Sequence, residues 1–327
     1  FEELNGTDVI LLIGATPALS TTMAGVRIRK AVKQGSKLML IGPNRTWFDD
    51  FAQWHFQTDE TAFLTAMLEA LQNPEATGEA AQAAAIYRGA KKAMIVYHDA
   101  QVSRQAAVLA ASLAKKSGHI GHARDGLIVL KPGANSQGLS LLGVKPASQI
   151  DWTTIKAVIS FGEMLPEACT QNAEFLAVQD VYLTDTASRA DVVLPGSIFA
   201  ETDGTYLSAQ RKLGVVRKAF RPLCGFEGWQ MIQALANDCM ESRGMDYESP
   251  AEIFADLCAK VEGLRGANRC AGCGKHPAFW PVGQSPVLTP VAEKDVPQQA
   301  NAPLCVPQGC ANVLGQKFTI KRNSTRQ

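Results

Sequence analysis

The chain has little charge and no excess of either sign. Charged side chains make up 19 % of its 327 residues, below the roughly 25 % of an average soluble protein, and the formal net charge is +1. Bulk electrostatics therefore do not favour nucleic acid or an anionic membrane surface as a partner. With an apolar share of 46 %, the sparse charge excludes a disordered chain and indicates that a partner protein covers part of the surface.

Signals for export and for membrane insertion are also missing. No apolar run approaches the roughly 20 residues of a membrane-spanning helix, and the N-terminal segment FEELNGTDVI has neither a basic region nor a cleavage site. We therefore expect a cytoplasmic protein with reduced cysteines and no direct membrane span. The chain also lacks an initiator methionine and begins almost directly with a strand, which predicts a C-terminal fragment of a longer polypeptide.

Apolar runs that end near glycine and alternate with helical segments predict an α/β fold. Residues 8–13 and 37–41 read as strands buried on both faces, and the segment 21–34 between them provides the helical crossover that parallel strands need. A similar pair of strands is expected at 155–161 and 181–183. This weak internal repeat predicts two doubly wound, Rossmann-like lobes, with polar turns at the carboxyl ends of their strands, where open α/β sheets bind ligands.

Composition divides the chain into three parts. Residues 1–150 are expected to form the first α/β lobe, in which the glycine-rich stretch 126–143 reads as a long functional loop. Residues 151–262 form the expected second lobe. Seven of the 16 prolines fall in 263–327, which is therefore predicted to be an irregular tail over the body or a partner. Further helices are expected at 59–71, 80–88, 103–116, 228–238 and 250–261, further strands at 93–97 and 191–194, and no clear element at 172–178.

Two turns of the first lobe follow predicted strands and carry groups that suit a nucleotide. Gly14 and Thr16 precede a helix whose amino terminus would favour a phosphate, although an ordinary strand-to-helix turn has the same pattern. Asn44 and Arg45 follow the second strand, where Arg45 could meet a phosphate or be a solvated side chain. An NAD-binding unit has an acidic residue at the end of that strand, but Gly42 stands there, which weakens the NAD interpretation.

A further candidate is the loop Asn135-Ser136-Gln137, which holds three hydrogen-bonding side chains between glycines that allow a ligand to approach the backbone. A solvated loop is the alternative. His119 and His122 have a spacing that allows a metal pair, but with no third ligand nearby a structural role is favoured. The sequence contains no GxSxG, HExxH or P-loop motif, and no catalytic residue is identified.

Four cysteines of the tail form the sharpest local pattern. Cys270 and Cys273 make a CxxC pair, and Cys305 and Cys310 follow as a second pair. Four thiolates suit a [4Fe–4S] cluster or Zn²⁺, whereas the wide spacing of the second pair leaves free thiols or a local disulfide as the alternative. We expect a metal site here, with a [4Fe–4S] cluster as the first choice.

Several motifs together resemble the molybdopterin oxidoreductase family. The segment ILLIGATP…RIRKAV…GSKLMLIGPNRT is similar to that family's first α/β segment, SGHIG to its TGNIG, PGANSQG to its GxNxxQG and GEMLP to its GENP. The most specific match is VQDVYLTDTASRADVVLPGSIFAETDGTYLSAQRKLGVVRKAF, which is similar to VQDxFxTETAxxADVVLPAxxFAEKDGTxxNxERRVQ. The matches run in order over about residues 7–240.

The resemblance implies one of two branches. One comprises formate dehydrogenase alpha subunits, which carry a bis-molybdopterin guanine dinucleotide cofactor and iron–sulfur clusters. The other comprises the large G-type iron–sulfur subunit of complex I and its electron-bifurcating, NAD-linked relatives, in which the same fold is largely a scaffold without molybdenum. In both, the cysteines of the main clusters lie upstream of this segment. The cofactor-binding positions that follow from the motifs and turns are Gly14, Thr16, Asn44, Arg45, Asn135, Ser136, Gln137, Glu163, Thr184 and Asp185.

Three departures from the family pattern favour the second branch. Gly42 and Asn44 stand where the family has the Asp and Arg of its DPR turn, and Met164 replaces the Asn of GENP. Each lost polar side chain would leave a cofactor atom unpaired at a cost of roughly 1–3 kcal/mol, so bound molybdopterin guanine dinucleotide is the less favoured expectation. We therefore expect a scaffold and iron–sulfur carrier in an NAD(P)H-linked electron-transfer complex, with flavin/NAD-binding and other iron–sulfur subunits as partners. The alternatives are a formate dehydrogenase catalytic subunit and a redox-inactive assembly scaffold.

Overall fold

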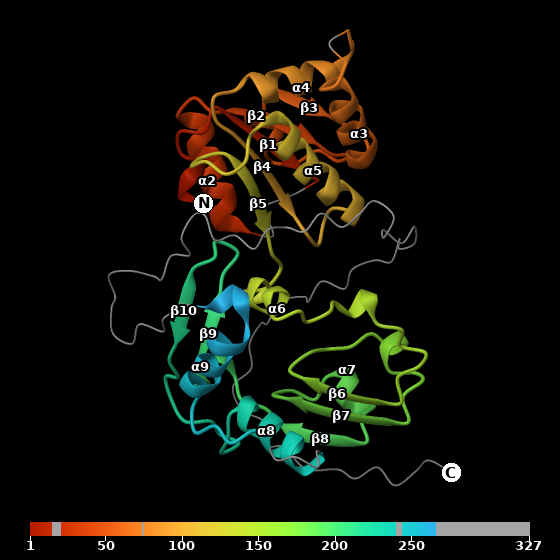
Figure 1. Ribbon diagram of the computed structural model, residues 1–327. Coiled ribbons are helices and arrows are strands. Elements are labelled where there is room, and N and C mark those ends of the chain that lie inside the picture. The colour runs from red at the N-terminus through yellow and green to blue at the C-terminus, as the bar shows by residue number, and fades with distance from the viewer. Residues whose placement is uncertain (15–20, 74, 240–243, 266–327) are drawn as a thin grey trace. The chain divides into compact units, whose positions relative to one another are not determined.

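The chain folds into two compact units, which are described separately (Figure 1). The structure, a computed structural model, describes all residues except 15–20, 74, 240–243 and 266–327. Unit 1 comprises Phe1–Gly138 and Leu207–Lys212, and unit 2 comprises Leu139–Tyr206 and the described residues that follow Lys212. Within these described parts, none of the helices has the length and apolar character needed to cross a membrane.

Unit 1 is built on a five-stranded parallel sheet with the strand order β3-β2-β1-β4-β5. The chain adds β2 and β3 on one side of β1 and then returns to add β4 and β5 on the other side, which is the order of a doubly wound fold. The point where the order reverses therefore lies between β1 and β4. The strands are β1 (Val9–Ile13), β2 (Lys37–Ile41), β3 (Trp54–Phe56), β4 (Ala93–His98) and β5 (Gly126–Leu130).

Helices cover both faces of this sheet. Side chains of α2 (Thr22–Lys33) join the core cluster on one face, and side chains of α3 (Glu60–Ala70), α4 (Glu79–Gly89) and α5 (Arg104–Ser117) join the cluster on the other. Every residue of β1 and β4 is buried between these layers, as expected for central parallel strands with long apolar runs. Local caps set where two of the helices begin: Asp59 Oδ1 accepts from Ala62 N at 2.8 Å, and Ser103 Oγ accepts from Ala106 N at 3.0 Å.

Unit 2 contains a smaller parallel sheet of β6 (Ala157–Phe161), β7 (Phe175–Asp180) and β8 (Val192–Pro195), in that order. One face packs on the short helix α7 (Asp185–Ser188) and a single core cluster. Outside this sheet, β10 (Leu213–Val216) pairs with β9 (Gly204–Leu207). The unit also contains the helices α8 (Gly228–Cys239) and α9 (Pro250–Lys260). The short helix α6 (Ser136–Leu141) follows the last strand of unit 1.

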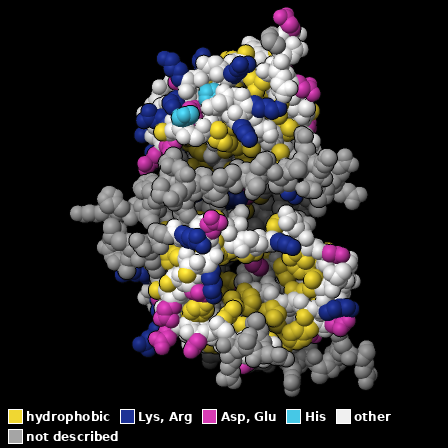
Figure 2. All heavy atoms as spheres, in the orientation of Figure 1, with side chains coloured by type: hydrophobic (Ala, Val, Ile, Leu, Met, Phe, Trp, Pro, Cys, Tyr) yellow, Lys and Arg dark blue, Asp and Glu magenta, His cyan; other side chains and the backbone are white. Residues whose placement is uncertain are grey.

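The other face of the sheet in unit 2 is partly open among the described residues. Ile159 is 43 % exposed, Phe175 42 % and Val192 36 %. In β6, exposed and buried residues alternate along the strand. Figure 2 shows hydrophobic side chains gathered around the position of β6 and β7. Ala177 and Gln179 of β7 alternate onto the same face and are buried, so the open part of this face among the described residues is limited to Ile159, Phe175 and Val192. Such exposure is unusual because parallel sheets are normally buried on both faces.

The predicted α/β class with two lobes built on parallel sheets is confirmed. The doubly wound strand order is seen in unit 1, whereas the sheet of unit 2 has the sequential order β6-β7-β8. Ten predicted elements agree with the structure to within one residue at each end, among them the strands at 37–41 and 93–97 and the helices at 59–71 and 103–116. The predicted strand at 181–183 is wrong, because Asp180 Oδ1 accepts from Val181 N at 2.7 Å and turns the chain out of the sheet. The strand that precedes this turn is β7 (Phe175–Asp180), which begins within the stretch 172–178 for which no clear element was predicted.

The glycine-rich stretch 126–143 is also not one long loop. It contains β5, which pairs with β4 from Gly126 onward, and the short helix α6. Gly126 has a φ of +124°, a conformation that side chains rarely adopt, so glycine is what allows the chain to enter the sheet edge here. The sequence patterns also miss β3, which has three residues and is too short for alternation to show, and the β9–β10 pair.

Candidate functional site

Three neighbouring strands of unit 1 end side by side at its carboxyl edge. Ile13 pairs with Ile41 of β2 and with Tyr97 of β4, so the edge is formed by Gly42, Gly14 and His98. Gly14 N donates to Ile41 O at 2.8 Å, and this N–H is therefore committed to the sheet. The glycine keeps this edge free of a side chain, and its predicted place in a ligand site stays a prediction.

A carboxylate from the next helix lies against these two glycines. Glu60, in the first turn of α3, places Oε1 where a Cβ atom on Gly14 would meet it at 2.8 Å and a Cβ atom on Gly42 at 3.5 Å. Val102 Cγ1 would meet the same Gly14 Cβ at 2.9 Å, and Gly14 has a φ of +53°. Glycine at position 14 is thus required both by the backbone conformation and by the close approach of Glu60. Partial burial raises the pKa of the Glu60 carboxyl, and the nearby Asp59 carboxylate adds to the rise.

On the other side of Gly14, a buried histidine has one nitrogen without a partner. His98 is 3 % exposed, its Nδ1 accepts from Ala100 N at 3.2 Å, and its Nε2 has no hydrogen-bond partner among the described residues. Burial lowers the pKa of His98 and favours the neutral ring. Because Nδ1 accepts, the neutral ring carries its proton on Nε2, which is a buried donor that lacks an acceptor.

Beyond His98 the edge continues with an ion pair between two turns. Asp99 Oδ2 accepts from Lys131 Nζ at 2.5 Å, which joins the end of β4 to the end of β5. Asp99 Oδ1 is also buried without a hydrogen-bond partner in the described structure. His98 Nε2 and Asp99 Oδ1 are thus two buried polar atoms without a hydrogen-bond partner among the described residues, and they lie at the edge where doubly wound sheets bind ligands.

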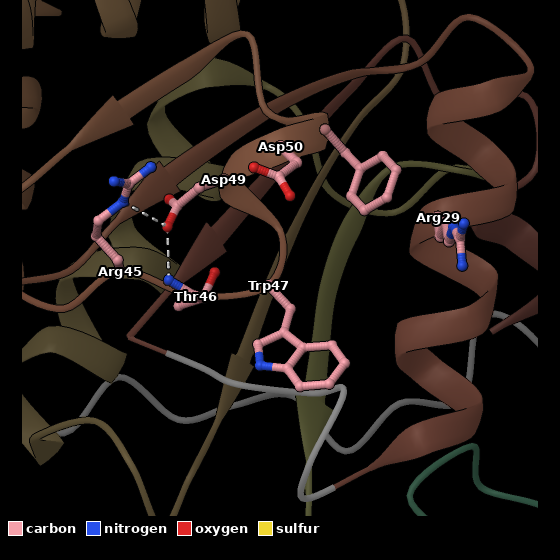
Figure 3. Close-up of a pocket in the computed structure, with 7 residues that line it drawn as sticks. Arg29, Arg45, Thr46, Trp47, Asp49 and Asp50 are labelled. Carbon is pink, nitrogen blue, oxygen red and sulfur yellow. Dashed lines mark hydrogen bonds and ion pairs between the residues drawn. The ribbon is translucent and has the colours of Figure 1, made fainter.

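A pocket of about 580 Å³ opens beside the end of β2 (Figure 3). Its wall includes Arg45, the indole of Trp47, which is 76 % exposed, and Arg29 of α2, whose guanidinium carbon lies 5.0 Å from the ring centre of Phe51. Asp49 and Asp50 also line the pocket, so the formal charges of its wall balance. The exposed indole offers a face on which a base can stack, and the two guanidinium groups offer donors to phosphate oxygens.

Asp49 organises the turn that carries this pocket. Its Oδ2 accepts from Thr46 N at 2.6 Å and lies 3.6 Å from Arg45 Nε (Figure 3). Its Oδ1 contacts His55 Nδ1, while His55 Nε2 lies 3.3 Å from Gly42 O. Arg45 therefore lies beside the pocket within ion-pair distance of Asp49, with a side chain that is 79 % exposed. The neighbouring Asn44 is also exposed, and a ligand contact of either residue stays a prediction.

The predicted loop 135–137 also belongs to unit 1, and two of its three polar side chains accept hydrogen bonds from the chain itself. Asn135 Oδ1 accepts from Leu207 N at 2.9 Å, and Ser136 Oγ accepts from Gly133 N at 3.0 Å. A Cβ atom on Gly138 would lie 2.3 Å from Asn135 Oδ1, so the glycine makes room for this side chain. Asn135 and Ser136 therefore shape the loop, and Gln137 is its partly exposed polar neighbour.

In unit 2 the predicted positions lie at the carboxyl ends of β6 and β7. Glu163 and Asp185 are exposed, and Thr184 caps α7, its Oγ1 accepting from Ala187 N at 3.3 Å. The turn after β6 is held by Thr186, whose Oγ1 accepts from Leu165 N at 2.9 Å. Arg189, which sequence reasoning missed, donates from Nη2 to Leu165 O at 3.3 Å. These two residues position the turn that presents Glu163.

The predicted metal ligands Cys270, Cys273, Cys305 and Cys310 lie outside the described residues, as does Thr16. Within the described ranges no group of three or more His, Cys, Asp or Glu side chains could hold a metal ion. His119 is 5 % exposed, with Nε2 at 2.9 Å from Tyr87 O and Nδ1 at 3.2 Å from Asp125 Oδ1. The predicted structural role of His119 is confirmed by these contacts.

Comparisons with known proteins identify the family to which this chain is similar. Residues 1–238 match the family model of molybdopterin oxidoreductases. F420-dependent formate dehydrogenase 2 subunit alpha of Methanococcus maripaludis is 38 % identical over 96 residues, which are 29 % of this chain and 14 % of that protein. F420-dependent formate dehydrogenase subunit alpha of Methanocaldococcus jannaschii is 36 % identical over 101 residues, 31 % of this chain and 15 % of that protein. The matched stretch is thus a small part of these relatives' length.

Among solved structures, acetylene hydratase from Pelobacter acetylenicus shares the fold, with a TM-score of 0.59 at 15 % sequence identity. The similarity covers 78 % of this chain and 50 % of the acetylene hydratase chain. It supports the Rossmann-like architecture of the two units and carries no information on what this chain binds.

Proposed function

We propose that this chain, which belongs to the molybdopterin oxidoreductase family, is the nucleotide-holding part of the large subunit of a multi-subunit, formate-dehydrogenase-type oxidoreductase. The observation that carries the proposal is the Nε2 proton of His98, a buried donor at the carboxyl edge of unit 1 for which the described residues offer no acceptor. Native proteins rarely leave such a donor unpaired. A nucleotide at this edge would supply the missing acceptor oxygen.

The residues at the edge fit the nucleotide end of a molybdopterin-type cofactor. Gly14 and Gly42 form a cradle that a Cβ atom would fill, and the pocket next to it offers Trp47, Arg29 and Arg45 to a base and its phosphates. In this proposal the chain's own residues bind and orient the cofactor, and the bound group supplies the redox chemistry. The remaining predicted residues, Asn135, Ser136, Gln137, Glu163, Thr184 and Asp185, stay candidate ligand-binding residues of their own units.

A second candidate is the scaffold and iron–sulfur carrier of an NAD(P)H-linked complex, similar to the G-type subunit of complex I. It is supported by Gly42, Asn44 and Met164, which replace polar groups of the family pattern, and by the side chain of Met164, which is 57 % exposed where the family has an Asn. In that proposal the four tail cysteines hold a [4Fe–4S] cluster or Zn²⁺, and flavin/NAD-binding and iron–sulfur subunits are the partners.

Metal and nucleotide analysis of the purified native complex separates the two candidates. We expect stoichiometric molybdenum or tungsten, together with guanine nucleotide released by acid, if the first proposal is right. A complex with neither would contradict it and favour the scaffold.

The tail cysteines need a test of their own. If the tail cysteines hold a cluster, Cys270→Ser should lower the iron and acid-labile sulfide of the complex by the content of one cluster, whereas Cys239→Ser, at an exposed cysteine of α8, should leave both unchanged. Unchanged iron and sulfide in Cys270→Ser would contradict the cluster.

A further inference from the structure

The helix α2 carries cations that no acidic residue nearby in the sequence balances. Residues 9–48 contain no aspartate or glutamate, whereas six Lys and Arg side chains fall in that stretch, in a chain whose net charge is only +1. The remainder of the chain is therefore net acidic. The ion pairs of the described residues use cations outside α2. The surface of unit 1 around α2 is thus a basic region on a chain of nearly balanced charge.

Four exposed side chains form one row along α2, whose opposite side packs on the sheet (Figure 1). Met23 is 61 % exposed and Val26 54 %, and Lys30 and Lys33 are exposed as well. Since residues three or four apart are neighbours on a helix surface, the row is apolar in the first half of the helix and cationic in its last turn. We call these four residues the α2 face.

The cationic end of the α2 face is remote from the carboxyl edge of the sheet. Because α2 follows β1 and precedes β2, which are parallel, it begins near the carboxyl edge and ends at the amino edge, where Lys37 starts β2. Twelve residues of helix span about 18 Å. The lysines of the α2 face therefore belong to a different surface from the candidate nucleotide site.

We propose that the α2 face is the docking surface for a partner protein that presents an apolar side chain beside a cluster of Asp and Glu. In such an interface the apolar contact at Met23 and Val26 contributes affinity, and the opposite charges at Lys30 and Lys33 fix the orientation and raise the rate of association. The inference goes beyond the proposed function and does not depend on what binds at the carboxyl edge.

Charge disfavours the occupants that this chain could itself supply. In a symmetric dimer the same surface faces itself, so lysines would meet lysines or lie on the apolar half of the partner helix. The tail 266–327 has seven Lys and Arg residues and two acidic ones, and it would be repelled for the same reason. A nucleic acid would contact the lysines but gain little from Met23 and Val26, which offer no ring for base stacking.

A structural role is the competing explanation for the two lysines. Cations in the last turn of a helix interact favourably with the helix dipole. The helix α5 has the same arrangement, with Lys115 and Lys116 exposed in its last turn. It provides a matched control within unit 1, because reversing its lysines carries the same penalty for the helix. A docking role predicts a loss of binding only for α2.

The test is site-specific photo-crosslinking in the cells that produce the chain, where it is assembled with its native partners. Val26→p-benzoylphenylalanine places the reactive group on the α2 face. Val108→p-benzoylphenylalanine is the control on α5, where Val108 is 37 % exposed. We expect position 26 to crosslink to another polypeptide, at a segment that carries adjacent acidic residues, and position 108 to give no crosslink to that segment.

Charge reversal then tests the cations. Lys30→Glu together with Lys33→Glu should lower the crosslink yield from position 26 about tenfold, because like charges would meet. Lys115→Glu together with Lys116→Glu should leave the yield unchanged. Reversing the acidic residues of the partner segment to lysine should restore the crosslink to the Lys30→Glu and Lys33→Glu chain, which a misfolded chain would not allow.

A crosslink from position 26 to a second copy of this chain, to its own polypeptide or to nucleic acid would overturn the proposal. A partner segment without acidic residues, or no crosslink at all, would do the same. Equal yields before and after reversal of Lys30 and Lys33, or no recovery after reversal on the partner, would remove the role of the cations. The metal and nucleotide content of the complex, which tests the proposed function, is an independent measurement.

Discussion

The sheets of the two units have the same parallel pairing but different cover. In unit 1 two core clusters bury both faces, and every residue of β1 and β4 is buried. In unit 2 a single cluster covers one face, and Ile159 and Phe175 on the other are more than two-fifths exposed. Parallel sheets in native proteins are normally covered on both sides. Unit 1 follows this rule with its own residues, whereas the described residues of unit 2 leave part of one sheet face open.

The largest expected effect tests this difference with the same substitution in both sheets. Ile13→Ala in β1, where the side chain is 1 % exposed, should lower the free energy of unfolding by about 2–5 kcal/mol, because it opens a cavity in a closed core. Ile159→Ala in β6 should cost less than about 1 kcal/mol. Hydrogen exchange of β1 and β6 peptides in urea measures the two units separately. Equal costs would show that the face of Ile159 is covered after all.

A second substitution asks whether unit 2 compensates with polar contacts. Glu227 is 5 % exposed and accepts from Asp203 N at 3.0 Å, from Trp229 Nε1 at 3.2 Å and from Lys218 Nζ at 2.6 Å. Glu227→Gln should lower the free energy of unfolding of unit 2 by about 1–3 kcal/mol. The amide NH₂ of glutamine would face the groups that donate to Glu227, so a buried N–H would be left without an acceptor.

The control for Glu227 is another glutamate of the same unit. Glu174→Gln breaks an exposed ion pair with Lys156 at 2.6 Å and should leave the stability of unit 2 unchanged, since such pairs contribute little. Thermal unfolding monitored by hydrogen exchange distinguishes the two. A Glu227 variant as stable as the Glu174 variant would contradict the idea that polar contacts hold this part of unit 2.

Unit 1 contains a comparable carboxylate whose contribution depends on pH. Burial alone would raise the pKa of Asp125, but the backbone N–H of Ala93, the ring of His119 and the Lys92 ammonium together lower it. Because the pKa is lower in the folded chain, the stabilisation is fully present above the ordinary value of 3.8 and is lost as the pH falls through the depressed value. Asp125→Asn should therefore be less stable at neutral pH, and its thermal midpoint should depend less on pH in the acid range.

A pH series of melting curves for the wild-type chain and Asp125→Asn measures this dependence. Asp50→Asn, at an exposed carboxylate of the same unit, is the control and should follow the wild-type curve. Parallel wild-type and Asp125→Asn curves would contradict the prediction.

The smallest expected effect has the opposite sign and concerns the carboxyl edge. The pKa of Glu60 is raised by partial burial, so the ionised carboxylate is a small cost to the folded chain at neutral pH. Glu60→Gln should raise the thermal midpoint by about 1–2 °C, and this gain should disappear as the pH falls through the raised pKa toward the ordinary value of 4.5. A lower midpoint at pH 7 would show that Glu60 mainly stabilises its helix.

The sequence patterns locate the carboxyl edge of the sheet in unit 1, but they identify only some of the side chains that lie there. Gly14 and Gly42 are recognisable because each ends an apolar run. Glu60 is missed because an acid after an N-cap Asp59 is the ordinary start of a helix, and nothing local shows that the chain brings it back to Gly14. His98 could have been noticed as the polar residue that ends the apolar run 93–97. Its unpaired nitrogen could not, because pairing depends on the neighbours that the fold provides.

The sequence by itself determined the α/β class, the places where most strands and helices lie and the family, because apolar periodicity and motif order are local properties of the chain. Only the tertiary structure decided which carboxylate lies against which glycine, which imidazole finds no acceptor among the described residues, and which part of a sheet face those residues leave open. Those properties follow from the order and register of strands that are far apart in sequence, and a change in either would bring different side chains together.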